Sequence, residues 1–435
     1  MSPRGARAAV GALHPEELTL RNGVRAVAAQ LPGRHRQVVD VRLRVGPLWE
    51  PEALVGISHF LEHVLHRGTA RYPTAHALAE AFESRGATLE AATYTDHGSM
   101  TVSAPAESFA RSVALLGEVF ARPTFGGLEA ERGIVRAEIL DLVDEAGELI
   151  DPDDLSRRLI FGDHPLGRSI TGPTEHLDRF GRRELRAHHR AHYVASSTVV
   201  ATAGPLAGRE ALAAIARAFA GLPPGSVPEI PPPPEQRGAR RRHVANSGSQ
   251  TDVRLAFRAP GLGDAREPAT ELLVRVLDDG MATRLYHEIC DRRGLAYDIS
   301  AVYEPYAGAG LLEIVSEAAP ERVVRLVTVL CDLAASLRDR GPTAAELTKA
   351  KRRAAWQLAE ALDDPAEIAE HLALARLLGT ARTPAERLAE LEAVSRESAR
   401  RAAEAMFDGA RASLLTVGRL PRGAARDLDA QLARL

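Results

Sequence analysis

The sequence predicts an α+β fold made of two similar halves, each with a mainly antiparallel sheet and helices packed on it. Three observations lead to this prediction. The chain has 435 residues, more than a single hydrophobic core usually contains. Strand-like and helix-like patterns are mixed along it, which suggests an α+β class. A proline-rich stretch divides it into two parts in which a similar order of patterns recurs.

The first part begins with strand patterns. Residues 19–30 predict a strand pair around an Asn22-Gly23 turn, and residues 38–46 alternate apolar and polar side chains as a half-buried strand does. Further along, the apolar spacing predicts helices at 52–66 and 74–85, strand at 88–104, and helices at 106–121 and 128–145. This order favours an antiparallel sheet with helices on one side.

A proline-rich segment, residues 223–248, predicts a linker, because its prolines remove backbone donors and favour extended chain. We therefore expect an N-terminal half at 1–222 and a C-terminal half at 249–435. The later half repeats the earlier order, with strands at 251–258, 296–303 and 309–317 and helices at 266–278, 281–292 and 319–338. An internal duplication is the hypothesis that this order suggests.

Composition excludes several classes of function. The chain has 55 Lys and Arg against 58 Asp and Glu, so no strong positive field attracts nucleic acid. No run approaches the roughly 18 apolar residues that a membrane span needs. The two cysteines, Cys290 and Cys331, cannot form a disulfide framework, and the first residues lack a signal-peptide core. We expect a cytoplasmic protein that binds neither nucleic acid nor a membrane.

A metal-binding pattern stands in residues 56–69, GISHFLEHVLHRGT. His59 and His63 are four apart, so on a helix they share one face and can converge on one ion. Glu62 places a carboxylate beside them. This His-x-x-Glu-His order is the reversed form of the zincin motif. The alternative interpretation is a helix that carries two exposed histidines and a solvated glutamate.

A catalytic zinc site needs three protein ligands and an open position, so a third ligand should come from another element. In residues 131–138, ERGIVRAE, Glu131 and Glu138 are seven apart and share one face of a predicted helix. Inward carboxylates on a partly apolar face are candidate ligands. The alternative is an amphipathic surface helix in which Glu131 pairs with Arg132 or Arg136.

These residues give the chain a specific resemblance. GISHFLEHVLHRGT, followed by the glutamates of ERGIVRAE, resembles the M16 (pitrilysin/insulinase) metallopeptidases, in particular the class of about 420 residues that includes mitochondrial processing peptidase. The resemblance covers essentially the whole chain. Further segments similar to that family are 81–97, 164–172, 188–204 and 280–301.

The resemblance implies a zinc endopeptidase with one Zn²⁺ per chain. His59, His63 and Glu138 would bind the metal, Glu62 would be the catalytic base, and Glu131 would be a supporting acid of the catalytic site. The two halves would have the LuxS/MPP-like fold and enclose a chamber for unfolded or short peptides, with leader or presequence-like peptides among the candidates. Other histidines, namely His66, His97, His188, His189 and His192, are expected to be packed or solvated instead.

The chain departs from the family pattern in its second half. Active members carry an arginine and a tyrosine seven apart that contact the substrate. Here Tyr297 occupies the tyrosine position and Cys290 the arginine position. A thiol cannot make the charge-assisted bonds of a guanidinium. The edge strand reads Glu90-Ala91-Ala92-Thr93 where the family has Asn-Ala-x-Thr.

Three interpretations of the chain's role are compatible with this departure. In the first, a homologous partner chain supplies the Arg/Tyr pair, and this chain is the catalytic subunit of a heterodimer. In the second, a homodimer works with Tyr297 alone. In the third, the chain is a structural or peptide-holding subunit without activity, although a scaffold gains nothing from keeping a charged cluster that is costly to bury.

Overall fold

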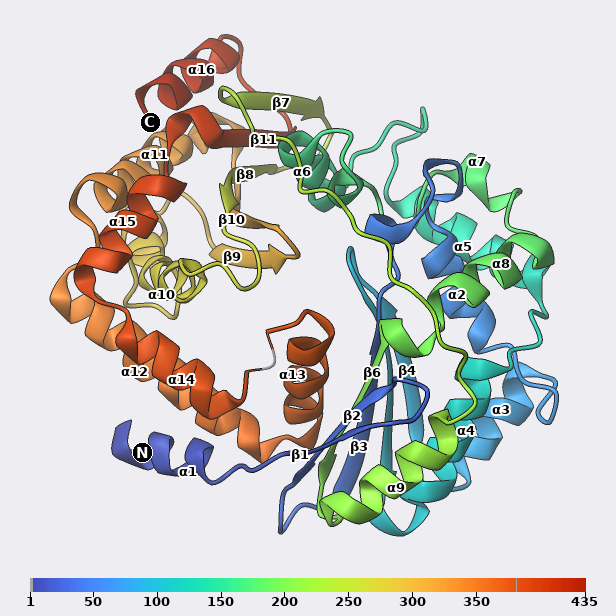
Figure 1. Cartoon of the computed structure of the whole chain (residues 1–435). Helices are drawn as coiled ribbons and strands as arrows, with labels where there is room; N and C mark the ends of the chain where they lie inside the picture. Colours follow the sequence, from blue (N-terminus) through green and yellow to red (C-terminus); the bar gives the residue numbers. More distant parts are fainter. Residues whose placement is uncertain (1–2, 381) are drawn as a thin grey trace. The chain divides into compact units, whose positions relative to one another are not determined.

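The computed structural model describes residues 3–380 and 382–435, which form two compact units. Unit 1 contains Met1–Asp141, Arg168–Ile230 and Gln357–Glu386, and unit 2 contains Leu142–Gly167, Pro231–Trp356 and Arg387–Leu435. Each unit is built around one sheet (Figure 1). Within the described residues, no helix combines the length and the apolar composition that a bilayer crossing requires.

Unit 1 has a six-stranded sheet in the order β1-β2-β6-β3-β5-β4. Its neighbouring strands are antiparallel except for the parallel pair β2 and β6. Strand β4 therefore forms one edge, with an unpaired backbone along its outer side. The strands are β1 (Glu16–Thr19), β2 (Arg25–Gln30), β3 (Arg36–Leu43), β4 (Thr88–Thr93), β5 (Gly98–Pro105) and β6 (Thr198–Gly204).

Helices cover both faces of this sheet, so the expectation of helices on one side is wrong for unit 1 (Figure 1). One face carries the large core, in which Phe60, Phe109 and Phe120 are fully buried. The other face is covered by α13. The helices of unit 1 are α1 (Pro3–Gly11), α2 (Ile57–Leu65), α3 (Ala75–Glu83), α4 (Phe109–Ala121), α5 (Leu128–Asp141), α7 (Thr174–Leu177), α8 (Arg182–His192), α9 (Gly208–Phe219) and α13 (Pro365–Leu377).

Unit 2 has a five-stranded sheet in the order β7-β11-β8-β10-β9, antiparallel except for β7 and β11. Its strands are β7 (Arg240–Ala245), β8 (Thr251–Ala259), β9 (Ile299–Tyr306), β10 (Ala309–Ala318) and β11 (Ala412–Gly418). The accompanying helices are α6 (Pro152–Phe161), α10 (Glu267–Leu277), a π-helix (Tyr286–Asp291), α11 (Val323–Arg340), α12 (Ala344–Glu360), α14 (Pro384–Ala393), α15 (Arg396–Met406) and α16 (Ala424–Arg434).

The units differ from the expected halves 1–222 and 249–435 in two segments. Helix α13, from the C-terminal half of the sequence, packs on β2, β3 and β6 of unit 1, and α6, from the N-terminal half, packs on β7, β8 and β11 of unit 2. The local sequence of a helix does not reveal which sheet the helix covers. In the expected linker, residues 223–239 carry no helix or strand, and β7 begins at Arg240.

The two sheets share a repeated detail that supports the duplication hypothesis. The letters Asp-Val-Arg-Leu occur at 40–43 in β3 and at 252–255 in β8, which hold equivalent places in the two strand orders. Arg42 Nε lies 2.7 Å from Asp40 Oδ2, and Arg254 Nε lies 3.1 Å from Asp252 Oδ1. Each arginine also pairs with an acid on the helix that its unit takes from the other half of the sequence. Arg42 pairs with Glu370 of α13, and Arg254 pairs with Asp153 of α6.

Candidate metal centre

Helix α2 presents the motif residues on its less buried side. Gly56 precedes the helix as its N-cap, and its φ of 97° is a left-handed conformation that glycine adopts without steric cost. Its apolar side chains, Ile57, Phe60, Leu61, Val64 and Leu65, are buried in the core of unit 1. Because the helical period leaves the remaining positions together, His59, Glu62 and His63 line one partly exposed side.

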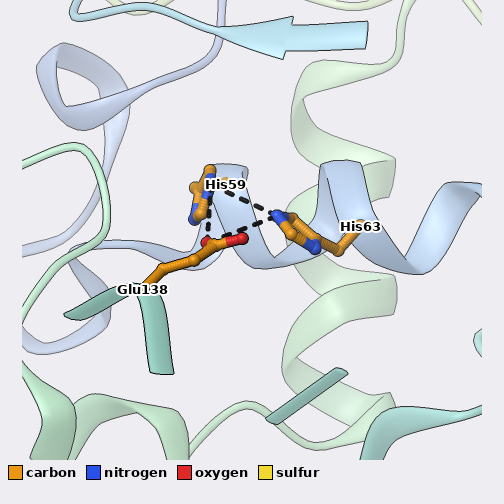
Figure 2. A group of neighbouring side chains, drawn as sticks. All are labelled: His59, His63 and Glu138. Carbon is orange, nitrogen blue, oxygen red and sulfur yellow. Dashed lines mark hydrogen bonds and ion pairs between the residues drawn. The ribbon is translucent and has the colours of Figure 1, made fainter. Parts of the chain in front are cut away.

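Three predicted ligands converge at this side (Figure 2). His59 Nε2 and His63 Nε2 are 3.3 Å apart, and Glu138 Oε2, from α5, lies 3.6 Å from the first and 3.7 Å from the second. Among the described residues, no other group of three His, Cys, Asp or Glu side chains converges in this way. Glu138 retains 42% of its side-chain exposure, so the group is open to solvent.

These distances fit a zinc ion. Two nitrogen atoms that each lie about 2.05 Å from a tetrahedral zinc are about 3.3 Å apart, which matches the separation of His59 Nε2 and His63 Nε2. The carboxylate oxygen of Glu138 is a few tenths of an ångström farther away than such a ligand, a shift that a side chain can make. Burial and the neighbouring His63 lower the pKa of His59 to about 4, so its imidazole is neutral, as a ligand must be.

Glu131 supports this group from the second predicted position. Its side chain is buried, with Oε2 3.1 Å from His63 Nδ1 and Oε1 paired with Arg67 Nε. A histidine that donates from Nδ1 to a carboxylate leaves Nε2 free to bind a metal. The alternative pairing of Glu131 with Arg132 or Arg136 is not what the structure shows, since both arginines lie beside Asp178.

Glu62 stands next to the ligands and contacts the edge strand. Thr93, the last residue of β4, donates its hydroxyl to Glu62 Oε2 at 2.5 Å. Burial raises the pKa of Glu62, and the Thr93 hydrogen bond and His63 oppose this rise. A carboxylate with a raised pKa is a better proton acceptor near neutral pH. The candidate base therefore has both an orienting partner and a direct link to the free edge of the sheet.

Comparison with known proteins gives the family. A family model described as "Insulinase (Peptidase family M16)" matches residues 25–174, and one described as "Peptidase M16 inactive domain" matches residues 179–354. A protein of Mycobacterium tuberculosis named "uncharacterized zinc protease" is 30% identical over 431 residues, which cover 97% of this chain and 96% of that protein. The chain belongs to the M16 peptidase family.

Other M16 relatives agree with this assignment. The zinc protease YmxG of Bacillus subtilis is 26% identical over 411 residues, which cover 93% of this chain and 98% of the relative. A crystal structure titled as a peptidase M16 inactive domain from Pseudomonas fluorescens superimposes with a TM-score of 0.86 at 22% identity, over 94% of this chain and 98% of that one. The expected family and the expected α+β fold of two similar units are therefore confirmed.

Four of the five other histidines considered in the sequence have hydrogen-bond partners in this M16 chain. His188 Nε2 lies 2.9 Å from Ser58 Oγ, His189 bonds the carbonyl of Phe120, and His192 bonds the carbonyl of Arg44. His97 is buried between Asp96 and Arg42. His66 follows the last turn of α2 and is not part of the converging group.

Tyr297 and Cys290 belong to unit 2, whereas the converging group belongs to unit 1. The Tyr297 side chain is 95% exposed, and Cys290 is partly buried in the π-helix. The assignment of Tyr297 as a substrate-binding residue stays a prediction.

Sequence reasoning missed three residues that hold the centre. Thr93 belongs to the expected edge strand, but its bond to Glu62 depends on tertiary packing. Arg67 lies in the turn after α2, and its pairing with Glu131 also depends on tertiary packing. Glu50 caps the first turn of α2 from outside the helix, and its isolated position gives no local signal.

Proposed function

We propose that this M16 protein is a zinc-dependent endopeptidase that cleaves unfolded or short peptides. The observation that carries the proposal is the convergence of His59 Nε2, His63 Nε2 and Glu138 Oε2 at zinc spacing, with the Glu62 carboxylate beside them. A structural zinc site would close its fourth position with another side chain, whereas this group has three ligands and an open side. The names of the curated relatives, which are zinc proteases, support the same conclusion.

The residues divide the chemistry among them. A zinc ion held by His59, His63 and Glu138 would supply Lewis-acid chemistry, polarising a peptide carbonyl and lowering the pKa of water toward about 7. Glu62 accepts the proton of the attacking water and delivers it to the departing amine. Thr93 donates to one oxygen of that carboxylate and thereby orients the side chain. Glu131 keeps the proton of His63 on Nδ1 and fixes the orientation of its ring.

Strand β4 supplies a place for the peptide. It is the edge of the unit 1 sheet, and its last residue bonds the candidate base. An extended peptide can add to such an edge through main-chain hydrogen bonds, which do not depend on side-chain identity. The replacement of the family asparagine by Glu90 leaves these backbone groups in place. Peptides that are already folded cannot offer an extended strand, so unfolded or short ones are the expected substrates.

A second candidate arises from Cys290. Because a thiol replaces the substrate-binding arginine, we propose as the alternative that the chain is the catalytic subunit of a dimer with another M16-like chain. A homologous partner would supply the Arg/Tyr pair in a heterodimer, whereas a homodimer would rely on Tyr297. A non-catalytic, peptide-holding subunit is the third possibility, and the convergent zinc ligands argue against it.

The test compares two glutamate variants with one zinc ion bound per chain. Glu62→Gln removes the proton acceptor and keeps the size of the side chain, so turnover of an unstructured peptide mixture should fall by about 100- to 10,000-fold with zinc retained. Glu80→Gln, an exposed position on α3, is the matched control and should keep full activity. Equal turnover by the two variants would exclude Glu62 as the base and with it the proposed mechanism.

The same assay separates the assemblies. The purified chain is measured alone and together with any homologous chain that copurifies from the native cell. Cleavage that appears only with the partner supports the heterodimer. Equal cleavage with and without it rejects the partner hypothesis.

A further inference from the structure

The first turn of α2 is capped by a carboxylate from outside the helix. Glu50 precedes the helix by several residues and is only 5% exposed. Its Oε2 accepts a hydrogen bond from the backbone amide of Gly56 at 2.8 Å, and its Oε1 accepts one from the amide of Ser58 at 2.8 Å. One side chain thus holds two amides of the turn that carries the first metal-ligand candidate, His59.

These two amides need such an acceptor. The first amides of an α-helix have no carbonyl partner inside the helix, and a buried amide without a partner costs about 1–3 kcal/mol. Gly56, at the position before the helix, has no side chain that could cap it. Negative charge is also favourable at the positive end of the helix dipole. Burial raises the pKa of Glu50 to about 7, which shows how strongly this acid is removed from water.

The backbone around Glu50 is fixed as well. Arg168 donates to the main-chain carbonyl of Glu50 at 2.8 Å. A Cβ built on Gly56 would lie 2.1 Å from the carbonyl oxygen of Thr171, and one built on Gly172 would lie 2.1 Å from that of Val55. Two stretches of chain therefore touch through glycine backbones beside the start of α2. The backbone from which the Glu50 side chain reaches the helix is therefore held in place by these contacts.

Ser58 extends the same network to the residue next to His59. While its amide bonds Glu50, its hydroxyl accepts from the amide of Gly46 at 2.9 Å and lies 2.9 Å from His188 Nε2. All these groups are buried. A change at Glu50 would release the amide of Ser58 and disturb its other two bonds. His59, the next residue, would lose the fixed backbone from which its ring is aimed.

We infer that Glu50 is a positioning residue for the metal centre: by holding the amides of Gly56 and Ser58, it sets where His59 stands relative to Glu138. This inference rests on the proposed zinc function. It assigns Glu50 no contact with metal, water or peptide. The two ends of the motif are then held separately, the N-terminal end by Glu50 and the His63 end by Glu131.

The experiment measures metal affinity on folded apoprotein, with Glu50→Gln against Glu52→Gln. The glutamine has the same length but only one acceptor atom, and its amide group would face a backbone N–H. Glu52 is exposed and two residues away, so it is the matched control. Zinc affinity is determined by competition with a chromophoric chelator, and Co²⁺ replaces zinc for a visible absorption spectrum. The Glu50→Gln protein should bind zinc about 10- to 100-fold more weakly and show a weaker tetrahedral Co²⁺ band, whereas Glu52→Gln should match the wild type.

These readouts separate positioning from simple stability. A purely structural cap would lower the melting temperature of the apoprotein and leave the zinc affinity and Co²⁺ spectrum of the folded fraction unchanged, which would overturn the inference. If E50Q does not fold, E50D keeps the charge but is one methylene too short to hold both amides. Wild-type zinc affinity in folded E50D would overturn the inference, and a loss of affinity would support it. Failure of the wild-type chain to bind zinc would instead reject the proposed function.

Discussion

Helix α13 lies in the C-terminal half of the sequence but packs in unit 1. This leads to a prediction about the smallest part of the chain that can fold. The N-terminal half expected from the sequence ends before the proline-rich segment, whereas unit 1 also requires Gln357–Glu386. A fragment of residues 1–230 would leave one face of the six-stranded sheet without its covering helix. That face carries apolar side chains of β2, β3 and β6 that are fully buried in the whole chain: Val27, Ala29, Val38, Val199, Ala201 and Ala203.

The magnitude follows from what α13 buries. Ile368, Leu372 and Leu377 are each no more than 1% exposed against the sheet. Burial of each such side chain stabilises by about 1.5–3 kcal/mol, so the three together contribute about 5–9 kcal/mol. A typical domain has a free energy of unfolding of about 5–15 kcal/mol. Loss of α13 therefore removes most of the stability of unit 1.

The assay is urea denaturation followed by far-ultraviolet circular dichroism, with a dye that binds exposed apolar surface. The 1–230 fragment should lack a cooperative transition and bind the dye. Coexpression with 231–435 should restore the cooperative transition and abolish dye binding. In the whole chain, Leu372→Ala should lower the free energy of unfolding by about 2–5 kcal/mol, whereas the exposed Glu367→Ala should change it little. A 1–230 fragment that unfolds cooperatively at the same urea concentration as the whole chain would refute this reasoning.

Three further predictions concern the centre. Thr93→Val removes the 2.5 Å bond to Glu62, worth about 1.5–3 kcal/mol, and should lower kcat about tenfold or more with zinc content unchanged; unchanged kcat would contradict the bond's role. Glu131→Gln should weaken zinc binding about 10- to 100-fold in a chelator competition, because His63 and Arg67 lose a shared carboxylate; equal affinity would contradict this. The pKa of Glu50 is raised from 4.5 to about 7, so its contribution to stability is complete below 4.5 and is lost as pH rises through 7. In metal-free urea titrations, wild-type stability should therefore fall by about 2–3 kcal/mol more than that of Glu50→Gln between pH 5 and 8, and parallel pH profiles would contradict the shift.

The centre could be predicted from the sequence to the extent that it depends on local helical spacing. His59, Glu62 and His63 lie on one turn, so their convergence follows from the period of the helix. Glu138 comes from a different helix, and the spacing of ERGIVRAE alone does not distinguish a metal-binding helix from an amphipathic surface helix. The family resemblance was needed to connect the two elements. The structure places Glu138 beside the histidines, as that resemblance implied.

The supporting residues could not be predicted because they depend on packing between distant segments. Glu50 reaches back to α2 across a turn, and Thr93 meets Glu62 only after the edge strand has packed beside that helix. Helix α13 shows the same limit at a larger scale. Only the folded chain shows that this helix completes the sheet of unit 1. The repeated Asp-Val-Arg-Leu of β3 and β8 could have been read from the letters, and it is the clearest trace of duplication.

The M16 assignment and the departure at Cys290 lead to different experiments. The family and the ligand geometry concern whether the chain holds zinc and cleaves peptides, whereas Cys290 and the exposed Tyr297 concern whether it does so alone. A Cys290→Arg variant would restore the charge that the family pattern has at this position. If this variant cleaves peptides without a partner while the wild-type chain needs one, the loss of the arginine is the reason that the chain does not act alone.

The most direct test of the account is the zinc content of the folded chain, measured by elemental analysis after dialysis, together with its peptidase activity. The account predicts about one zinc per chain, activity that disappears with a chelator and returns with added zinc, and loss of both zinc and activity in His59→Ala and Glu138→Gln. A wild-type chain that cleaves peptides without bound zinc, or the same zinc content and activity in both ligand variants, would contradict it.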